Sequence, residues 1–406
     1  MQVNIPTKEE LNDFLDRAIN DILPSKEDFA KALTSGKRLK IYAGIDPTAP
    51  TLHIGHMIGL LKLCTLQKWG HEIILLVGDF TGMIGDPTGK ETVRKKLTKE
   101  EVLENAKLYK KQASTFLNFD DKKNPAQLKY NSQWLSGLTF SDVIELASEF
   151  TVSQMLERDM FQDRIKENKP IFLHEFLYPL MQGYDSVVMD VDVEIGGNDQ
   201  LFNMLAGRDM LKRRGKEKFV LTLQLLVDQS GKKMGKTEGN MISLLDSENE
   251  MFGKVMSWTD DMIFKGFRLC TKIESAKIDE MEREFLSKKS HPMDLKKYLA
   301  KSIVALYHGK EAGNMAQQEF EKIFQKKERP TEIQEFIIDE SPKNIIDLLI
   351  LTKLAKNKSE AKRFIDQKGV KVNDMVIEDA KIDIAVDKDP VLIQRGKRFF
   401  VKVKMK

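Results

Sequence analysis

Residues 38–80 read RLKIYAGIDPTAPTLHIGHMIGLLKLCTLQKWGHEIILLVGDF, and this stretch decides the fold. Residues 38–45 have the pattern of a buried strand that leads into the turn Asp46-Pro47-Thr48. A helix pattern begins near His53 and ends at Gly70, and residues 71–80 form a second, intensely apolar strand of the parallel type. Strand, turn, helix and strand in this order predict a right-handed βαβ unit, the start of a doubly wound α/β sheet.

The rest of the chain divides into further segments. A mostly helical section, roughly residues 98–190, interrupts the α/β pattern, and VDVEIGGNDQ (191–200) and KFVLTLQLLV (218–227) restore it with two strands. We therefore predict a Rossmann-like catalytic domain over 1–244 with a helical insertion at about 98–190. A charged helical domain over 245–330, a linker over 331–343 with little periodicity, and a small α+β domain over 344–406 complete the prediction.

Composition and charge describe a globular protein with one basic region. The 406 residues carry a net charge of +3, but residues 344–406 alone hold 15 Lys and Arg against 9 Asp and Glu, which predicts an anionic partner there. No apolar run approaches the roughly 20 residues of a membrane span, and the N-terminal stretch has the pattern of an amphipathic helix. Two cysteines far apart in the chain, Cys64 and Cys270, indicate a reducing cytoplasm.

The two histidines of HIGH, residues 53–56, can be interpreted in several ways. They can be structural, they can bind phosphate at a helix N-terminus, where unpaired N–H groups attract anions, or they can serve as a metal or acid/base pair. A zinc site needs three or four ligands, and the cysteines show no CxxC-type spacing, so metal is disfavoured. The stretch alone leaves structure and phosphate binding open.

A second segment, GKKMGKTEGN (231–240), places Lys233 and Lys236 on either side of a Met-Gly step, between a strand and a helix. It does not meet the P-loop spacing, and alone it is typical of a solvated loop. HIGH after the first strand and KMGKT (233–237) about 180 residues later together resemble the two signatures of class I aminoacyl-tRNA synthetases. Gly235 and Thr237 replace two serines of the usual second motif, and both lysines are kept.

Five stretches resemble the tyrosyl-tRNA synthetases: YAGIDPTAPTLHIGH (42–56), GDFTGMIGDPTGK (78–90), EFLYPLMQGYD (175–185), IGGNDQ (195–200) and KMGKTEGN (233–240). The spacing i, i+4, i+7 puts Tyr178, Gln182 and Asp185 on one helix face. Asp185 can accept the proton of a phenol and Tyr42 can bind its oxygen. The resemblance implies that Asp86, Tyr178 and Gln182 bind the α-ammonium group of tyrosine, with Gln200 near the carboxylate.

The same resemblance implies an ATP site. Thr48, His53, Lys233 and Lys236 would contact the phosphates, and Lys90 and Arg94 lie in a basic loop that could close over the nucleotide. His56, Gly55 and Asp199 would contact the nucleoside, and Asp46, Gly235 and Thr237 complete the set. Ala43 stands where the family often has a cysteine, so one ribose contact differs. We expect Mg²⁺ to enter with ATP, and we expect no dedicated metal site and no prosthetic group.

The basic tail resembles an S4-type RNA-binding module. Its candidate phosphate contacts are Lys353, Lys356, Lys358, Lys362 and Arg363, with Asn357 or Ser359 as a helix cap. The resemblance implies tRNA-Tyr as partner and a homodimer, for which the helical insertion is a plausible interface. The alternatives are an RNA-binding protein on an inactive synthetase-like scaffold, a tryptophanyl synthetase, or another HIGH-containing nucleotidyltransferase. Tyr42, Asp185 and the S4-type tail disfavour the last two.

Overall fold

The computed structural model describes residues 3–86, 97–227, 241–324, 333–387, 389–396 and 399–406. The chain forms two compact units, Met1–Gly309 and Lys310–Lys406. Within the described ranges, no helix is both long and apolar enough to cross a membrane.

The first unit is built on a six-stranded sheet in the order β1-β6-β5-β2-β3-β4. Its strands are β1 (Ile19–Leu23), β2 (Lys40–Ile45), β3 (Glu72–Val77), β4 (Gln127–Tyr130), β5 (Val193–Gly197) and β6 (Phe219–Leu223). The five strands β2 to β6 are parallel, and the edge strand β1 is antiparallel to β6. The predicted α/β sheet is confirmed, with an antiparallel edge that the sequence pattern did not indicate.

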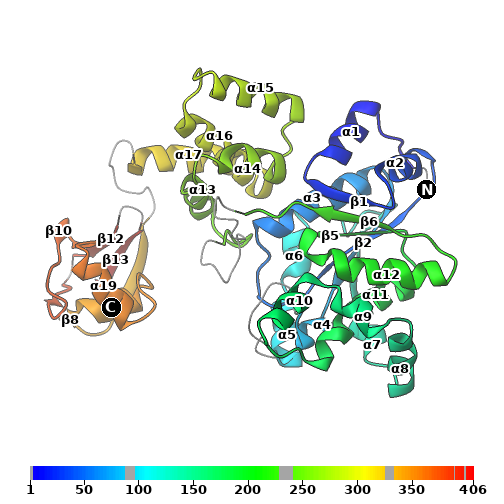
Figure 1. Ribbon diagram of the computed structural model, residues 1–406. Coiled ribbons are helices and arrows are strands. Elements are labelled where there is room, and N and C mark those ends of the chain that lie inside the picture. Colours follow the sequence, from blue (N-terminus) through cyan, green and yellow to red (C-terminus); the bar gives the residue numbers. More distant parts are fainter. Residues whose placement is uncertain (1–2, 87–96, 228–240, 325–332, 388, 397–398) are drawn as a thin grey trace. The chain divides into compact units, whose positions relative to one another are not determined.

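Helix α3 (Ile54–Lys68) connects β2 to β3 and packs on β2, β3 and β5, as the βαβ pattern predicts. Helices α11 (Leu173–Met189) and α12 (Leu201–Arg213) pack closely on each other and lie in front of the sheet in Figure 1. A buried cluster joins the sheet to these helices through Tyr42, Ile74, Leu76, Met189, Val191 and Leu211. Tyr42 is therefore buried within this core, with 1% of its surface exposed.

The section 98–190 is helical as expected, apart from one strand. Its helices are α5 (Lys99–Ala106), α6 (Tyr109–Ala113), α7 (Ser132–Leu135), α8 (Phe140–Ser148), α9 (Val152–Leu156), α10 (Asp159–Lys166) and α11. Strand β4 lies within this section and pairs with β3 in parallel. The section therefore also contains a continuation of the sheet, which four residues of mixed polarity did not reveal.

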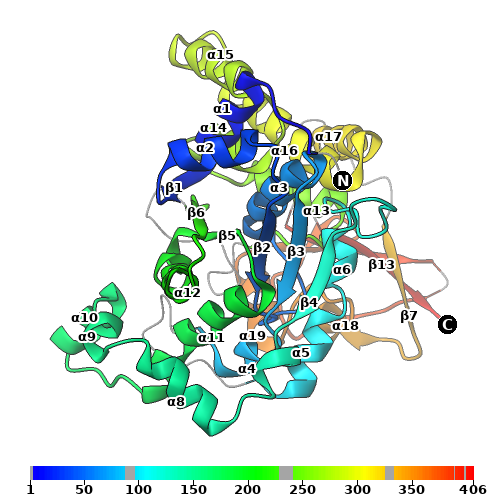
Figure 2. The same ribbon diagram turned by 90° about the vertical axis from the view of Figure 1, so that its right-hand side faces the viewer.

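The remaining helices of the first unit are α1 (Lys8–Asp16), α2 (Lys26–Thr34), α4 (Thr81–Ile84) and the group α13 (Glu248–Met256), α14 (Met262–Cys270), α15 (Ser275–Leu286) and α16 (Pro292–His308). Figure 2 shows α1 and α2 near one end of the sheet. Arg17, directly after α1, donates hydrogen bonds to the carbonyl oxygens of Phe267, Arg268, Thr271 and Ile273. One guanidinium therefore binds the chain's first helix to the end of α14.

The second unit contains α17 (Lys310–Phe324), α18 (Ile345–Leu351) and α19 (Lys358–Asp366). Its main sheet has the order β10-β9-β12-β13-β7, from β7 (Gln334–Ile338), β9 (Val370–Val372), β10 (Met375–Val376), β12 (Val391–Arg395) and β13 (Phe399–Met405). A short pair joins β8 (Lys343–Asn344) to β11 (Asp383–Ile384). The prediction of a linker over 331–343 is wrong for the residues of β7, because this strand pairs in parallel with β13 and belongs to the domain.

Candidate active site

The candidate site lies at the carboxyl ends of the parallel strands. Asp46 follows β2, Gly78 follows β3, and Gln200 ends the short 3-10 helix η1 (Asn198–Gln200) after β5. The strand order changes direction between β2 and β5, and open α/β sheets bind ligands in the crevice at such a switch point. Asp46, Gly78 and Gln200 come from three separate stretches of the sequence, and the parallel strands bring these stretches to one edge of the sheet.

One face of α11 supplies three polar side chains, as the spacing predicted. The Tyr178 hydroxyl donates to Asp46 Oδ2 at 2.7 Å, and Gln182 Nε2 donates to Glu194 Oε1 at 2.9 Å. Asp185, one turn further along, is 2% exposed. Tyr178 therefore contacts the end of β2, and Gln182 contacts β5.

The Asp185 carboxylate is surrounded by donors and by apolar walls. Its Oδ1 accepts from Trp134 Nε1 at 2.7 Å, and its Oδ2 accepts from Asn131 Nδ2 at 3.3 Å. Burial raises the pKa of Asp185 well above its usual range, and these two hydrogen bonds oppose the shift. Because both donors are N–H groups, the carboxyl faces them as an acceptor.

Tyr42 lies on β2 with its hydroxyl 3.0 Å from Ser186 Oγ. Burial, and the nearby carboxylates of Glu194 and Asp185, raise the pKa of the Tyr42 phenol, so it keeps its proton. Tyr42 and Asp185 were predicted to converge, and they lie close enough for the Asp185 charge to affect the titration of Tyr42. Their common neighbourhood is buried, which suits recognition of a single phenol hydroxyl.

Asp86 marks the other end of the group. Its Oδ2 accepts from Gln200 Nε2 at 2.7 Å, and its Oδ1 faces Arg158 Nη2 at 3.3 Å. Arg158 is buried and stacks near the rings of Phe161 and Phe202. Sequence reasoning missed Arg158, because it lies in the helical insertion with no spacing relation to the motifs.

A chain of polar contacts connects Asp46 to Asp185. Asp46 Oδ1 accepts from Thr81 Oγ1 at 2.7 Å, and Thr81 Oγ1 accepts from Asn131 Nδ2 at 3.0 Å. The glycine at position 78 is required here, since an added Cβ would lie 2.0 Å from Asp46 Oδ1. Asn131, which also contacts Asp185, therefore links the carboxylates of Asp46 and Asp185. Neither Thr81 nor Asn131 was singled out from the sequence.

A buried ion pair lies behind the α11 face. Lys218 Nζ contacts Glu194 Oε2 and lies 3.0 Å from Ser186 Oγ, with both charged side chains almost fully buried. Burial lowers the pKa of Lys218, and the Glu194 carboxylate opposes that shift. The pair was missed, although a glutamate within an apolar strand and a lysine at the start of another were visible signals, since charges this buried are normally paired.

The HIGH turn begins α3, and His53 is its N-cap. His53 Nδ1 accepts from the Gly55 amide and His56 Nδ1 accepts from the His53 amide, both at 3.1 Å. The Ile54 amide donates to the Ile242 carbonyl at 3.0 Å, and the His56 amide to the His53 carbonyl at 2.8 Å. The expectation of unpaired N–H groups at this helix start is therefore wrong. Because each Nδ1 accepts, each neutral ring carries its proton on Nε2, which is the nitrogen that can donate to a ligand.

Gly55 also has a packing role that the sequence did not indicate. A Cβ at this position would lie 2.9 Å from His53 Cε1, so the glycine makes room for the histidine ring. The two imidazole rings lie 3.9 Å apart between centroids. Thr48 is exposed beside the turn, and Asp199 is half-buried on η1. Lys90, Arg94, Lys233, Gly235, Lys236 and Thr237 lie outside the described residues.

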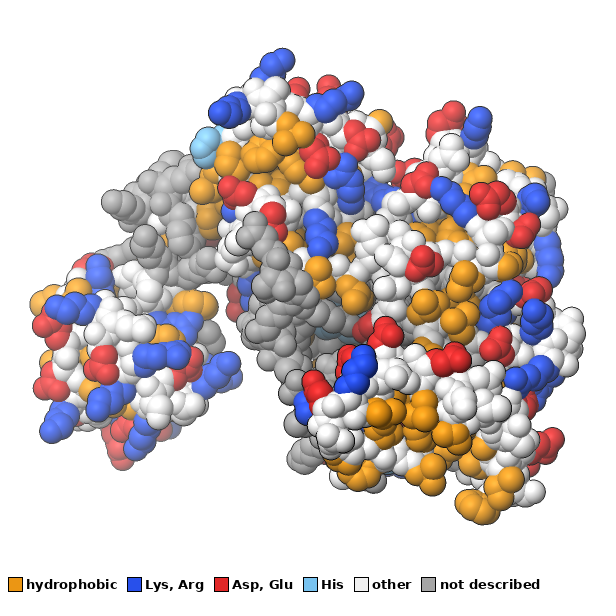
Figure 3. Space-filling model, in the orientation of Figure 1, with side chains coloured by type: hydrophobic (Ala, Val, Ile, Leu, Met, Phe, Trp, Pro, Cys, Tyr) orange, Lys and Arg blue, Asp and Glu red, His pale blue; other side chains and the backbone are white. Residues whose placement is uncertain are grey.

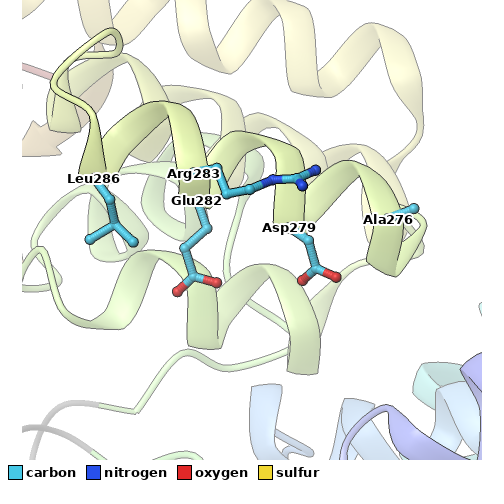
Figure 4. A pocket seen from close by; sticks show the side chains of 5 residues that line it. All are labelled: Ala276, Asp279, Glu282, Arg283 and Leu286. Carbon is cyan, nitrogen blue, oxygen red and sulfur yellow. The ribbon is translucent and has the colours of Figure 1, made fainter.

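No group of three or more His, Cys, Asp and Glu side chains within the described ranges is arranged to hold a metal ion. A shallow hollow along α15, far from the strand ends, is lined by Ala276, Asp279, Glu282, Arg283 and Leu286 (Figure 4). Asp279 and Glu282 each accept from Arg268 at 2.7 Å, so their charges are already paired. The hollow contributes nothing to the strand-end site.

The five candidate RNA-binding residues are all exposed and surround the turn between α18 and α19: Lys353, Lys356, Lys358, Lys362 and Arg363. Asn357 caps α19 by accepting from the Glu360 amide at 2.9 Å, so the first of the two suggested caps is the correct one. Of the five, Arg363 lies near Glu360 at 3.7 Å. The tail therefore presents a group of cations to solvent.

Comparison with known proteins bears on this geometry. Residues 34–325 match the model of the family "tRNA synthetases class I (W and Y)", and residues 319–403 match that of the "Tyrosine–tRNA ligase SYY-like C-terminal domain". The tyrosine–tRNA ligase of Thermotoga maritima is 45% identical over 399 residues, which cover 98% of each chain. The chain belongs to the tyrosine–tRNA ligase family. That of Carboxydothermus hydrogenoformans is 43% identical, over 96% of this chain and 97% of the relative.

Solved structures agree with the family assignment. The C-terminally truncated mitochondrial tyrosyl-tRNA synthetase of Coccidioides posadasii is similar with a TM-score of 0.63 and 25% identity, covering 77% of this chain and 92% of that one. The tyrosyl-tRNA synthetase of Archaeoglobus fulgidus, solved with L-tyrosine, shares the fold at a TM-score of 0.59 and 24% identity, over 76% of this chain and 99% of that one. As a member of the tyrosine–tRNA ligase family, the chain has the class I synthetase fold.

Proposed function

We propose that this member of the tyrosine–tRNA ligase family activates L-tyrosine with ATP and transfers the tyrosyl group to the 3′-terminal ribose of tRNA-Tyr. The observation that supports it best is the α11 face, where Tyr178, Gln182 and Asp185 point to the strand ends beside Tyr42 and Asp86. A buried acceptor at one end and carboxylate and phenol oxygens at the other match a substrate with a phenol and an ammonium group.

The hydrogen-bond directions agree with these assignments. Tyr178 gives its proton to Asp46 and so offers its oxygen to the α-ammonium group. Gln182 donates a hydrogen bond from its amide nitrogen to Glu194, so the Gln182 carbonyl oxygen remains able to accept one. Asp86 adds a negative charge, and Gln200 stands beside it, near the position proposed for the substrate carboxylate. Acceptors therefore surround the place proposed for the ammonium group.

In the first step, a carboxylate oxygen of tyrosine attacks the α-phosphorus of ATP, and the bond from that phosphorus to the bridging oxygen breaks. Negative charge gathers on the departing pyrophosphate, so donors and cations around it speed the reaction. We assign this work to Thr48, His53, Lys90, Arg94, Lys233 and Lys236. His53 acts through Nε2, since its Nδ1 caps α3. Mg²⁺ enters as Mg·ATP, and the proposal gives it no protein ligand.

The nucleoside occupies the adjoining region in this proposal. His56, Gly55, Asp46 and Asp199 lie on its side, with Gly235 and Thr237 from the second motif. In the second step, a hydroxyl of the terminal ribose of tRNA attacks the carbonyl carbon of the adenylate. AMP leaves with the bridging oxygen, and the hydroxyl proton goes to solvent. No protein nucleophile takes part.

Exchange of labelled pyrophosphate into ATP tests the activation step without tRNA. We expect exchange that depends on tyrosine and is strongly reduced when phenylalanine or tryptophan replaces it. A pocket with unpaired hydrogen-bonding groups rejects the analogue that lacks the hydroxyl, and the general example of this effect, about 10⁵-fold, is tyrosyl-tRNA synthetase itself. Equal exchange with phenylalanine would contradict the assignment of Tyr42 and Asp185.

We assign tRNA binding to the proposed domain 344–406 together with the strand β7, and catalysis to the proposed domain 1–244, with the helices α13 to α16 as its support. Phosphates bound by exposed cations give salt-dependent affinity with little sequence information. A chain ended before residue 333 should retain pyrophosphate exchange and lose most tRNA charging at physiological salt. Unchanged charging would contradict the role of the tail.

We further propose that two copies of the chain associate through the insertion. Large apolar side chains are exposed on its successive helices: Phe140 (81%) and Ile144 on α8, Val152 (69%) on α9, and Leu173 (78%) at the start of α11. Figure 3 shows hydrophobic side chains gathered in the lower part of this face, where Figure 1 places α8 and α10. Exposed apolar groups of this extent mark interaction sites, and symmetric dimers are the commonest assembly.

The dimer proposal predicts a change of mass. Phe140→Asp places a charge in the proposed interface, and light scattering should then report a monomer where the unchanged chain is a dimer. Met315→Asp, an exposed apolar position on α17, is the matched control and should remain dimeric. A monomeric unchanged chain at micromolar concentration would exclude this interface.

We also propose that the protein acts in the cytoplasm, where tRNA is charged in bacteria.

A further inference from the structure

The start of strand β13 carries an exposed aromatic side chain beside the core of the C-terminal unit. Phe399, Val401 and Val403 lie on one face of this strand, because alternate residues of a strand point to the same side. Val401 and Val403 are buried in the core of the unit, whereas Phe399 is 41% exposed. The apolar face of β13 therefore extends past the core and ends in an exposed ring.

Two arginines and a second aromatic ring form a row with Phe399. Arg395 on β12 lies directly opposite Phe399 across the two strands, and its guanidinium carbon lies 3.9 Å from the centre of the Phe399 ring. The same carbon lies 4.8 Å from the centre of the Phe364 ring on α19, and the guanidinium carbon of Arg363 lies 5.4 Å from that ring. Cation and ring therefore alternate from α19 to β13 in what we call the Arg–Phe row: Arg363, Phe364, Arg395 and Phe399.

The Arg–Phe row is anchored on the core and open at Phe399. Phe364 packs against the buried core of the unit. Arg395 lies against two rings, and cation–π contacts of this kind keep a guanidinium flat against its neighbours. Because Arg395 covers one side of the Phe399 ring, the exposed surface of this residue lies on its other side and at its edges. The row therefore presents a supported aromatic surface to solvent.

We propose that the exposed side of Phe399 stacks on an unpaired base of the bound tRNA, with Arg395 as the support of the ring and as a contact to the adjoining phosphate. Unpaired bases of RNA stack on aromatic side chains and on arginine planes, while nearby cations bind the phosphates. The proposal rests on the tRNA-binding role proposed above for the tail. It adds to that role the class of nucleotide that is bound, since a base inside a duplex is not free to stack on Phe399.

The charge around the Arg–Phe row fits this ligand. Arg363 is one of the five exposed cations assigned to tRNA, so the row is continuous with that group. Glu360 offsets part of the charge, since its carboxylate lies 3.7 Å from Arg363. Lys358 and Lys362 on the same helix are exposed, so α19 remains basic. A nucleotide presents a base and a phosphate together, and the row with α19 offers a partner to each.

Stacking can be distinguished from phosphate binding by its response to salt. Each phosphate contact releases counterions, so affinity falls as salt rises, and the slope of log affinity against log salt reports the number of these contacts. An uncharged ring that stacks on a base releases none. Loss of the Phe399 ring should therefore lower the affinity for tRNA by the same factor at every salt concentration, whereas loss of a cation should reduce the slope.

Binding of a tRNA-Tyr transcript to the full chain, measured over a range of salt concentrations, tests the proposal. We expect Phe399→Ala to lower the affinity about tenfold with an unchanged slope, the usual effect of losing one stacked base, and Phe399→Tyr to stay within about twofold. Ile337→Ala, at a 68% exposed apolar position on β7 of the same sheet, is the matched control and should bind as the unchanged chain does. Equal affinity of Phe399→Ala and the unchanged chain, or an equal decrease in Ile337→Ala, would overturn the proposal.

Three further variants complete the test. Phe399→Leu keeps an apolar side chain without a ring, so it should lose affinity about tenfold even if the alanine variant does not fold. The indole introduced by Phe399→Trp should lose fluorescence when the transcript binds, measured against the chain's own three tryptophans, and unchanged emission would overturn the stacking. Arg395→Lys keeps the charge and loses the planar contact with both rings, so we expect about a threefold decrease with the slope unchanged. Unchanged affinity of this variant would contradict the support by Arg395.

Failure of this proposal can be told apart from failure of the proposed function. All of these variants should keep tyrosine-dependent pyrophosphate exchange, because that reaction needs no tRNA. If the unchanged chain exchanges pyrophosphate but does not bind the transcript, the tRNA-binding role of the tail is wrong, and the stacking on Phe399 is overturned with it. If the unchanged chain binds the transcript and Phe399→Ala and Phe399→Leu bind it equally well, only the stacking is wrong.

Discussion

Helices α11 and α19 both carry a row of polar residues, and they use this polarity in opposite ways. On α11, Tyr178, Gln182 and Asp185 are turned inward, and each has a defined protein partner. On α19, Lys358, Lys362 and Arg363 are turned outward and exposed. The first arrangement limits which groups can donate and accept, and the second leaves the charges accessible to any phosphate.

The difference reflects the two proposed substrates. A small amino acid differs from its competitors by one hydroxyl, so selection needs buried groups whose hydrogen-bond directions are already fixed. A tRNA offers many equivalent phosphates, so affinity needs several exposed cations, and fixed directions would add little. Substitutions on α11 should therefore change which substrate is used, and substitutions on α19 should change how much tRNA is bound.

The largest effect is expected at Asp185. Asp185→Asn would remove the acceptor for the substrate hydroxyl and place an amide near the N–H groups of Trp134 and Asn131. We expect kcat/KM for tyrosine to fall about 1000-fold, because the substrate hydroxyl loses its acceptor and a buried N–H donor is left unsatisfied. Pyrophosphate exchange measures it, with the exposed Asp279→Asn as control. A decrease of less than tenfold would mean that α11 does not select the phenol.

The next effect is expected at His53, where structure and chemistry can be separated. Asparagine is a good N-cap, so His53→Asn should keep the start of α3 while removing the Nε2 donor. His53→Ala removes both. We expect kcat to fall about 100-fold in each variant, as for one donor to a developing charge, and only the alanine variant to be destabilised, by about 1 kcal/mol in urea unfolding. If both variants were equally destabilised and kept a near-normal kcat, His53 would act only as a helix cap.

The sequence predicted those features of the fold and the candidate sites that depend on local spacing. The βαβ unit, the α11 face and the five exposed cations of the tail all follow from patterns within one short stretch of chain. Arg158, Thr81, Asn131 and the Lys218 to Glu194 pair were missed, because each reaches the site only through pairing of distant segments. The same limit explains β7, whose strand partner β13 lies more than 60 residues away.

At the HIGH turn, the motif predicted the helix start correctly but the hydrogen bonding of the first amides wrongly. The motif indicates a helix start, and the start of α3 is indeed at this turn. The first backbone amides of a helix generally have no hydrogen-bond partner. Here the amides around this helix start donate to the His53 ring and carbonyl, to the His56 ring and to the Ile242 carbonyl. A histidine used as a cap is uncommon, and nothing in the spacing alone distinguishes a ring that caps from one that binds phosphate through both nitrogens.

The smallest effect, and the one that completes the contrast between the helices, is expected on α19. Replacing Lys358, Lys362 and Arg363 by glutamine should leave tyrosine-dependent exchange unchanged and reduce kcat/KM for tRNA charging about tenfold near physiological salt. The slope of log affinity against log salt should fall by about one for each side chain that no longer binds a phosphate. Three exposed lysines of the first unit, Lys8, Lys31 and Lys277, changed in the same way, form the control. If both triple variants weaken tRNA binding equally, general charge and not the α19 face binds the RNA, and the contrast with α11 would no longer hold.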